Sequence, residues 1–332
     1  MRMRRLPRTH LGRLADTRAA QALVVDKGPS IDTLTHNKLT WVNIERPTRE
    51  ETQYLAARYP FHPLDLDDCL SKTQTPKIDK YGEYLFMVFH FPVFNPQARV
   101  TTASQVSIFV GEDYLITLHQ GDLKPLVTLF RSCQTNEKVL QENMGHSSGY
   151  LLYRVLDRLV DYCFPILNKI GDNIEAVEDC IFSERPRGTV QDVAILRRDI
   201  ISFRRIIRPQ TDAVEVLERE EWPILKEDPE VYFGDIADHL RKIRDTLEDY
   251  KEVVEGLSDT NNTLTSFRIN EVIRVLTIIS VIMLPLTLVA SIVGMNIWPM
   301  QGGNPGAFAG VIIAMVVIIV AMLAFFRSLR WI

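Results

Sequence analysis

The stretch from Val275 to Phe326 contains no Asp, Glu, Lys or Arg, although these residue types make up 24% of the 332-residue chain. It holds two apolar runs of about 20 residues, each close to the length of helix that crosses ~30 Å of hydrocarbon. Between them, Trp298 to Gly306 is rich in proline and glycine, which break helices. The pattern predicts a helical hairpin in the bilayer, with membrane helices at about 275–295 and 307–326 joined by a loop at 296–306.

Cationic residues flank the hairpin on one side only. Arg268 and Arg274 precede the first span, Arg327 and Arg330 follow the second, and the loop carries none. Because cytoplasmic flanks of membrane helices are enriched in Lys and Arg, both termini are expected in the cytoplasm and the loop outside. The sequence predicts a multi-pass protein of the cell inner (plasma) membrane, with residues 327–332 as a cytoplasmic tail.

Composition excludes several functional classes. The net charge of −4 argues against a nucleic-acid partner. The four cysteines form no C-x-x-C pair, which argues against a zinc finger or a disulfide framework and agrees with a reducing compartment. The cytoplasmic part contains no nucleophile–base pairing, phosphate loop or zinc motif. An enzyme is therefore not expected, although a regulatory or enzymatic protein tethered by the hairpin is an alternative class.

The cytoplasmic part divides into three segments by composition. Residues 1–20 form a basic arm, and 21–145 hold strand-like runs between helical segments, which predict an α/β domain. Residues 146–230 have helical spacing of apolar residues, interrupted by a turn at 185–188, and predict an antiparallel helical pair.

Within the α/β domain, three local signals are specific. Tyr84 to Phe91 is a buried-strand candidate, and Val106–Val110 with Leu115–Leu118 predicts a hairpin. Thr48 and Glu51 form a capping box, which predicts the start of a helix.

One long helix is expected from 231 to 295. Its cytoplasmic half carries an a/d heptad seam: Ile236, Leu240, Ile243, Leu247, Tyr250, Val254 and Leu257. Since no proline follows until Pro285, the helix is expected to continue into the first membrane span, on the order of 90 Å in all. A helix of this length needs neighbours along its seam, which favours an oligomer around a shared axis.

The first membrane span carries a polar stripe. Five polar residues fall on one helical face: Asn270, Thr277, Ser280, Thr287 and Ser291. Hydroxyls in membrane helices often bond to the carbonyl of the preceding turn, and small residues favour close packing, so each residue alone is compatible with a structural role. The complete stripe favours an aqueous path lined by identical subunits.

The chemistry of the stripe indicates how an ion passes. Leu276 and Leu284 lie beside it, and rings of leucine close a pore by dewetting. The stripe contains no carboxylate, so it cannot replace the hydration shell of a divalent ion with charged ligands. Amides and hydroxyls suit an ion that keeps its water, and Mg²⁺ dehydrates reluctantly.

Ordered motifs run along nearly the whole chain: Phe61-His62-Pro63-Leu64 with Asp67-Asp68, Gln74-x-Pro76-Lys77, Tyr150 to Tyr153 with Leu156-Asp157, Asp235 to His239, Asn270 to Ile279, Met283 to Thr287, and finally Gly294-Met295-Asn296. Together they resemble the CorA family of magnesium and cobalt channels. The resemblance implies a funnel-shaped homopentamer with an α/β cytoplasmic domain and a long stalk helix that becomes the pore helix.

The resemblance also implies roles for residues of the membrane hairpin. Gly294, Met295 and Asn296 are expected to form the entrance that first holds a hydrated ion. Asn270 is expected near the cytoplasmic end of the pore. Ile273, with Leu276 and Leu284, matches positions that constrict it.

Acidic residues of the cytoplasmic part match regulatory cation sites of the family. By this resemblance, Asp68 and Asp235 form the main pair between subunits, and Asp67 and Asp157 lie near a second site. Carboxylates brought together repel one another, and a bound divalent cation converts that repulsion into a bridge. The implied activity is a Mg²⁺ channel, with Co²⁺ and Ni²⁺ as further candidate ions, that cytoplasmic Mg²⁺ closes.

Two departures from the family pattern leave an alternative open. The external loop has no acidic residue, and the usual lysine-rich tail is reduced to Arg327 and Arg330. Related ZntB-type zinc transporters also tend to have uncharged loops. A Zn²⁺ transporter, with proton coupling as a further option, is therefore the nearest alternative.

Overall fold

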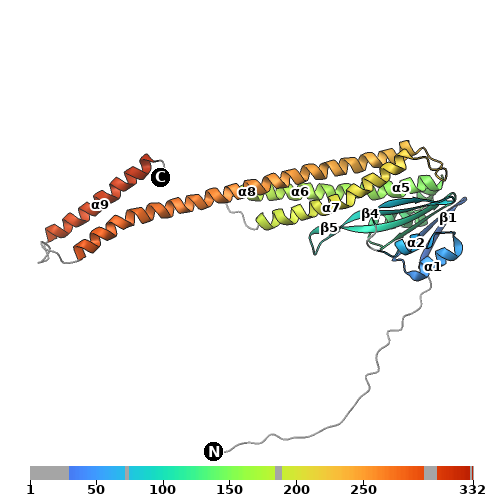
Figure 1. Ribbon diagram of the computed structural model, residues 1–332, viewed down its shortest axis with the longest axis horizontal. Helices are drawn as coiled ribbons and strands as arrows, with labels where there is room; N and C mark the ends of the chain where they lie inside the picture. Colours follow the sequence, from blue (N-terminus) through green and yellow to red (C-terminus); the bar gives the residue numbers. More distant parts are fainter. Residues whose placement is uncertain (1–29, 72–74, 184–188, 295–304, 330, 332) are drawn as a thin grey trace, which may run out of the picture.

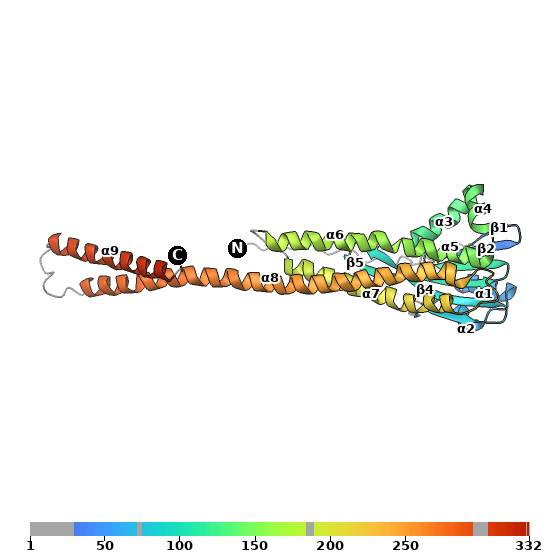
Figure 2. The same ribbon diagram turned by 90° about the horizontal axis from the view of Figure 1, so that it is seen from above.

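A computed structural model describes residues 30–71, 75–183, 189–294, 305–329 and 331. The chain is elongated, with a sheet and short helices gathered at one end and a single helix extending from there to the apolar hairpin (Figures 1 and 2). The predicted combination of an α/β domain, a long helix and a terminal apolar helix is confirmed.

A six-stranded mixed sheet forms the centre of the α/β end, in the order β1-β2-β6-β5-β4-β3. Only β2 and β6 pair in parallel; the other neighbours are antiparallel. The strands are β1 (Ile31–His36), β2 (Leu39–Glu45), β3 (Lys77–Lys80), β4 (Tyr84–Asn95), β5 (Val100–Gly111) and β6 (Tyr114–His119).

Helices cover both faces of this sheet (Figure 1). The short helices α1 (Arg49–Arg58) and α2 (Pro63–Asp68) pack on one face through a cluster that includes Leu55 and Leu66. Other helices pack on the other face, α8 with its first part: α3 (Lys124–Thr135), α4 (Glu137–Met144), α5 (Ser148–Asp161), α6 (Cys163–Phe182), α7 (Thr189–Arg219) and α8 (Pro229–Gly294). The sheet therefore separates α2 from α8.

The local signals of the α/β domain are confirmed. The predicted strands lie in β4, β5 and β6, and Val110 pairs with Leu115 in the predicted hairpin. Thr48 and Glu51 form both bonds of the capping box at the start of α1. The helices α2, α3 and α4 were not predicted: α2 and α4 are too short for a long apolar period, whereas α3 does carry one, at Leu126, Leu129, Phe130 and Cys133, which the sequence reasoning missed.

The first helix of the expected pair is divided into α5 and α6 at Tyr162. Pro165 has no N–H to donate to the carbonyl of Asp161, and its ring crowds that carbonyl. The division at Asp161 follows from this proline. The predicted turn at 185–188 lies outside the described residues, and α7 returns alongside α6 (Figure 2).

The long helix is present as α8, which spans 66 residues and about 100 Å at 1.5 Å per residue. Pro229 begins it, at the position where the missing N–H of proline costs nothing. The seam residues are buried, except for the half-buried Tyr250, against helices α5, α6 and α7 of the same chain. The sequence-based argument that the seam requires an oligomer is therefore wrong, since one chain closes the seam by itself.

Among the described residues, two helices are long and apolar enough to cross a membrane: the end of α8, and α9 (Pro305–Ser328). They lie side by side, and most of their side chains are exposed in the single chain. On α8 the less exposed apolar positions include Ile278, Ile282, Leu286, Val289 and Val293. Their spacings of four, four, three and four place them on one helical face, which packs against α9.

A buried glutamine joins α7 to the sheet. The side-chain amide of Gln210 donates to the carbonyl of His90 and accepts from its N–H at 2.9 Å. His90 lies two residues beyond Val88, where the pairing with the short strand β3 ends. The amide therefore supplies the two backbone partners that β3 is too short to provide.

Replacement of Gln210 by Ala is expected to destabilise the cytoplasmic part. It leaves two buried backbone groups of His90 without partners, at a cost of about 2–4 kcal/mol. The measurement is the unfolding temperature of the full chain in detergent, followed by tryptophan fluorescence. Gln53→Ala, at an exposed position of α1, is the control. Equal unfolding temperatures for the two variants would contradict the role of Gln210.

Candidate ion pathway and cation sites

The polar stripe lies on the side of α8 that faces away from α9. At about 100° per residue, its positions are roughly opposite the face that contains Ile278 and Val289. Asn270, Ser280, Thr287 and Ser291 are exposed in the single chain, and Thr277 is half-buried. The hairpin therefore has one face covered by its own second helix and a polar-striped face left open.

Hydroxyls of the stripe bond to their own helix. Thr277 donates to the carbonyl of Ile273 at 2.7 Å, Ser280 to that of Leu276 at 2.8 Å, and Thr287 to that of Met283 at 2.8 Å. Each hydroxyl uses its proton in this bond and keeps lone pairs that accept hydrogen bonds from water. The stripe therefore presents hydrogen-bond acceptors to the water molecules that hydrate a cation.

The residues matched to constrictions are also on the open side of α8. Ile273, Leu276 and Leu284 are exposed by 54%, 62% and 70%, so no described part of the chain covers them. Gly294 is the last residue of α8. Met295 and Asn296 lie outside the described residues, so their expected role at the entrance stays a prediction.

Asp67 and Asp68 lie at the end of α2. His62 caps this helix with its ring nitrogen, and Pro63 begins it. Asp67 is exposed, whereas Asp68 is half-buried and pairs with Lys77 at 2.8 Å.

Lys77 already satisfies the charge of Asp68. The same ammonium contacts Asp79 at 2.5 Å. Burial lowers the pKa of Lys77, but its hydrogen bonds to Asp68 and Asp79 outweigh burial and raise it overall. A divalent ion that binds Asp68 must therefore displace the ammonium group of Lys77 or share the carboxylate with it.

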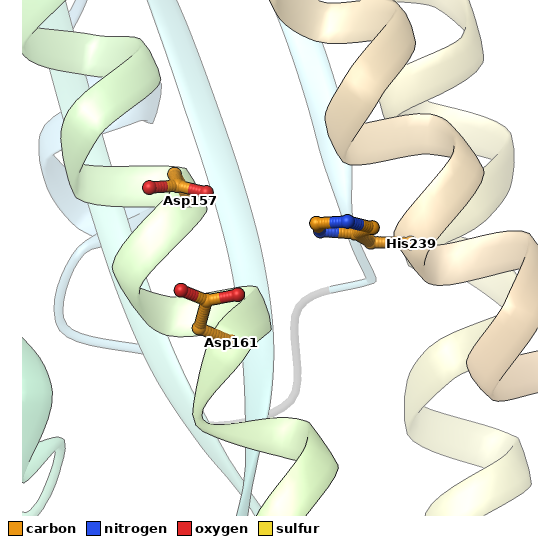
Figure 3. A group of neighbouring side chains, drawn as sticks. All are labelled: Asp157, Asp161 and His239. Carbon is orange, nitrogen blue, oxygen red and sulfur yellow. The ribbon is translucent and has the colours of Figure 1, made fainter.

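Asp157 belongs to a three-residue cluster with Asp161 and His239, in which the candidate ligand atoms lie within 4.8 Å of one another. Both aspartates project from α5 toward His239 on α8 (Figure 3). The ring of Phe164 packs edge-on against His239, with centroids 5.6 Å apart, and so restricts its orientation. Two carboxylates and one imidazole are a donor set that suits a divalent metal ion.

The surroundings of Asp157 disfavour the ionised form of its carboxyl group. Burial raises its pKa, the negative charges of Asp161 and Asp235 raise it further, and Arg154, 3.5 Å away, acts in the opposite sense. A cation bound between the carboxylates would relieve this repulsion.

The four matched aspartates fall into two groups. Asp235 lies one turn before His239 on α8, on the same helical face, and so belongs to the side of the molecule that holds Asp157. Asp67 and Asp68 lie on the opposite side of the sheet, with α2 (Figure 1). The single chain does not bring Asp68 and Asp235 together.

Sequence reasoning missed Asp161 and His239 as members of a cation site. A signal was present, because Asp157 and Asp161, and likewise Asp235 and His239, are four residues apart. That spacing places both members of each pair on one helical face. What remained unknown was that these two faces oppose each other.

Nearly the whole chain matches one protein family. Residues 36–328 match the family model described as CorA-like Mg2+ transporter protein. The chain belongs to the CorA family. A cobalt/magnesium transport protein CorA of Thermotoga maritima is 31% identical over 300 residues, covering 88% of this chain and 83% of that protein.

One further relative is informative about the fold, and another about the ion that relatives transport. The structure of the CorA magnesium transporter of Methanocaldococcus jannaschii matches with a TM-score of 0.76 at 23% identity, covering 91% of this chain and 94% of that one. The zinc transport protein ZntB of Yersinia pseudotuberculosis is 21% identical over 285 residues, covering 85% of this chain and 84% of that protein. The chain is thus a membrane protein of a metal ion transporter family, and its relatives are transporters rather than enzymes.

His239→Ala is expected to weaken Co²⁺ binding by about tenfold and Mg²⁺ binding much less. Imidazole is a preferred ligand for transition metals, whereas Mg²⁺ prefers oxygen. Titration calorimetry of the full chain in detergent measures both affinities, with His146→Ala, at an exposed position outside the cluster, as the control. Equal losses for the two ions, or no loss for Co²⁺, would remove His239 from the cation site.

Proposed function

We propose that this protein is a passive divalent-cation channel that carries hydrated Mg²⁺ into the cell, with Co²⁺ and Ni²⁺ as further substrates, and that cytoplasmic Mg²⁺ closes it. In this proposal the chain forms a homopentamer whose α8 helices surround the pore. Gly294, Met295 and Asn296 form the outer entrance. Both termini are in the cytoplasm and the hairpin crosses the inner membrane twice.

The observation that carries the proposal is the uncharged polar stripe on the face of α8 opposite α9. In a ring of subunits with α9 toward lipid, this face turns toward the axis. Asn270, Thr277 and Ser291 then contribute rings of amides and hydroxyls that contact the hydration shell. Since the described part of the stripe holds no carboxylate, the ion keeps its water, which suits Mg²⁺.

Closure by Mg²⁺ is supported by the positions of the regulatory aspartates. Asp68 and Asp235 lie on opposite sides of the sheet, so an ion that joins them must join two copies of the chain. An ion that binds only the closed assembly stabilises it by ~1.4 kcal/mol per site when present at tenfold its dissociation constant. Several sites acting together bias the pore toward closure.

Transport of Zn²⁺ is the second candidate. The similarity to the ZntB protein and the uncharged external loop favour it. Mg²⁺ is preferred here because the pathway offers amides and hydroxyls, whereas Zn²⁺ selects nitrogen and sulfur ligands.

Flux into proteoliposomes separates the two candidates. With an imposed membrane potential and no pH gradient, Mg²⁺ influx is expected, and Asn296→Ala is expected to reduce it strongly by removing the entrance amide. Fluorescent indicators report Mg²⁺ and Zn²⁺ inside the vesicles. Zn²⁺ flux that requires a proton gradient, without Mg²⁺ flux, would overturn the channel proposal, and full flux through Asn296→Ala in a verified pentamer would overturn the pore assignment.

The double variant Asp68→Asn with Asp235→Asn is expected to stay open at cytoplasmic Mg²⁺ concentrations that close the parent. Without these charges the ion no longer favours the closed assembly. Patch recordings with Mg²⁺ on the cytoplasmic side measure the effect. The control is Asp32→Asn with Asp249→Asn, which removes the same charge at exposed positions. Unchanged inhibition would show that Asp68 and Asp235 are not the sensor.

A further inference from the structure

A cavity of about 550 Å³ lies between α3, α4 and α5, next to the cation cluster. One face of each helix lines it. Lys124, Thr128 and Ser132 recur every fourth residue on α3, and Arg154 and Arg158 do so on α5. Its size is that of a site for a small organic ligand.

Positive charge converges in this cavity. Lys124, Arg154 and Arg158 all line it, and neither Lys124 nor Arg158 forms an ion pair with any residue that the structure describes. The lining also holds the carboxylates of Glu142 and Asp161, but Lys124 and Arg158 pair with neither, and cationic groups gathered in this way are typical of sites for phosphates and other multivalent anions.

Arg154 is fixed in place by a buried amide. Asn143 is 2% exposed, donates to the carbonyl of Val139 at 2.7 Å, and accepts from Nε of Arg154 at 3.1 Å. Nη1 of the same guanidinium faces Asp157 at 3.5 Å. A guanidinium has five N–H donors, so its other donors are available to a ligand in an orientation set by Asn143.

Part of the cavity wall is apolar, and one residue of the wall also belongs to the cation cluster. Leu129, Val139 and Tyr162 line it, so a ligand with an aromatic body gains contact there. Asp161 lines the cavity and is also a member of the cluster with Asp157 and His239. One end of the cavity therefore attracts anions while its border attracts a divalent cation.

We propose that this cavity binds a nucleoside polyphosphate together with a divalent cation. The phosphates contact Lys124, Arg154 and Arg158, the base packs between Leu129, Val139 and Tyr162, and the cation bridges the phosphates to Asp161. Glu142, exposed at the rim, accepts hydrogen bonds from the ribose hydroxyls. No covalent bond changes.

Binding in this cavity acts on the cation cluster. Phosphate oxygens compete with Asp157 for the guanidinium of Arg154, which frees the carboxylate for a metal ion. The two ligands therefore strengthen each other's binding, and by linkage the effect is reciprocal. This deepens the proposed regulation by Mg²⁺ and rests on it, because the cluster then responds to the ion and to its polyphosphate complex.

Titration calorimetry of the full chain in detergent tests the proposal, with ATP as the probe at buffered free Mg²⁺ and again with EDTA. ATP is expected to bind, and at least fivefold more tightly with Mg²⁺. Tripolyphosphate, which lacks a base, is expected to bind at least tenfold more weakly than ATP, and adenosine not measurably. No heat from ATP would overturn the proposal, and equal binding of tripolyphosphate and ATP would overturn the assigned place of the base.

Variants locate the site. Lys124→Gln and Arg158→Gln, both at exposed positions, are each expected to weaken ATP binding at least fivefold, whereas Arg131→Gln, on α3 outside the cavity, leaves it unchanged. Asp161→Asn is expected to abolish the Mg²⁺ dependence while ATP still binds in EDTA. Unaltered affinity in Lys124→Gln and Arg158→Gln, with unfolding temperatures equal to the parent's, would overturn the assignment. Nucleotide-free flux assays test the channel separately, so either proposal can fail alone.

Discussion

The backbone of a chain in hydrocarbon has no water to bond with, so its polar groups must be satisfied within a helix. In this protein that requirement is met by a helix, α8, that begins beside the α/β domain and continues through the apolar region. Because the helix is unbroken, the angular position of its apolar seam determines the angular position of the polar stripe. The packing of α5, α6 and α7 on one end therefore orients Thr277 and Ser280 at the other.

Features that depend on local pattern were predictable from the sequence. The uncharged hairpin, the long helix, the capping box at Thr48 and the strand from Tyr84 all rest on residues close together in the chain. The seam shows the limit of such reasoning. Its apolar spacing identifies Leu240 and Leu247 as buried, but does not say whether another subunit or another part of the same chain covers them. Here the same chain covers them.

The candidate sites depend on packing between distant segments and were only partly predictable. Asp68 and Asp235 were found through family resemblance, whereas the pairing of Asp68 with Lys77 required the fold. Asp161 and His239 come together because α5 and α8 lie side by side, a contact that no spacing within either helix reveals. The cavity beside Arg154 is built partly from α3 and α4, and their packing against α5 cannot be read from the spacing of residues within any one of these helices.

The closed seam also limits which surfaces of the chain are left for other contacts. A single chain buries the apolar residues of the α8 seam with its own helices, so the seam needs no second copy to cover it. The apolar surface that remains exposed lies chiefly along the end of α8 and on α9, where lipid is an acceptable neighbour. An assembly of several copies would therefore have to use other surfaces, such as the polar-striped face of α8 that α9 leaves open, and would not depend on the apolar seam.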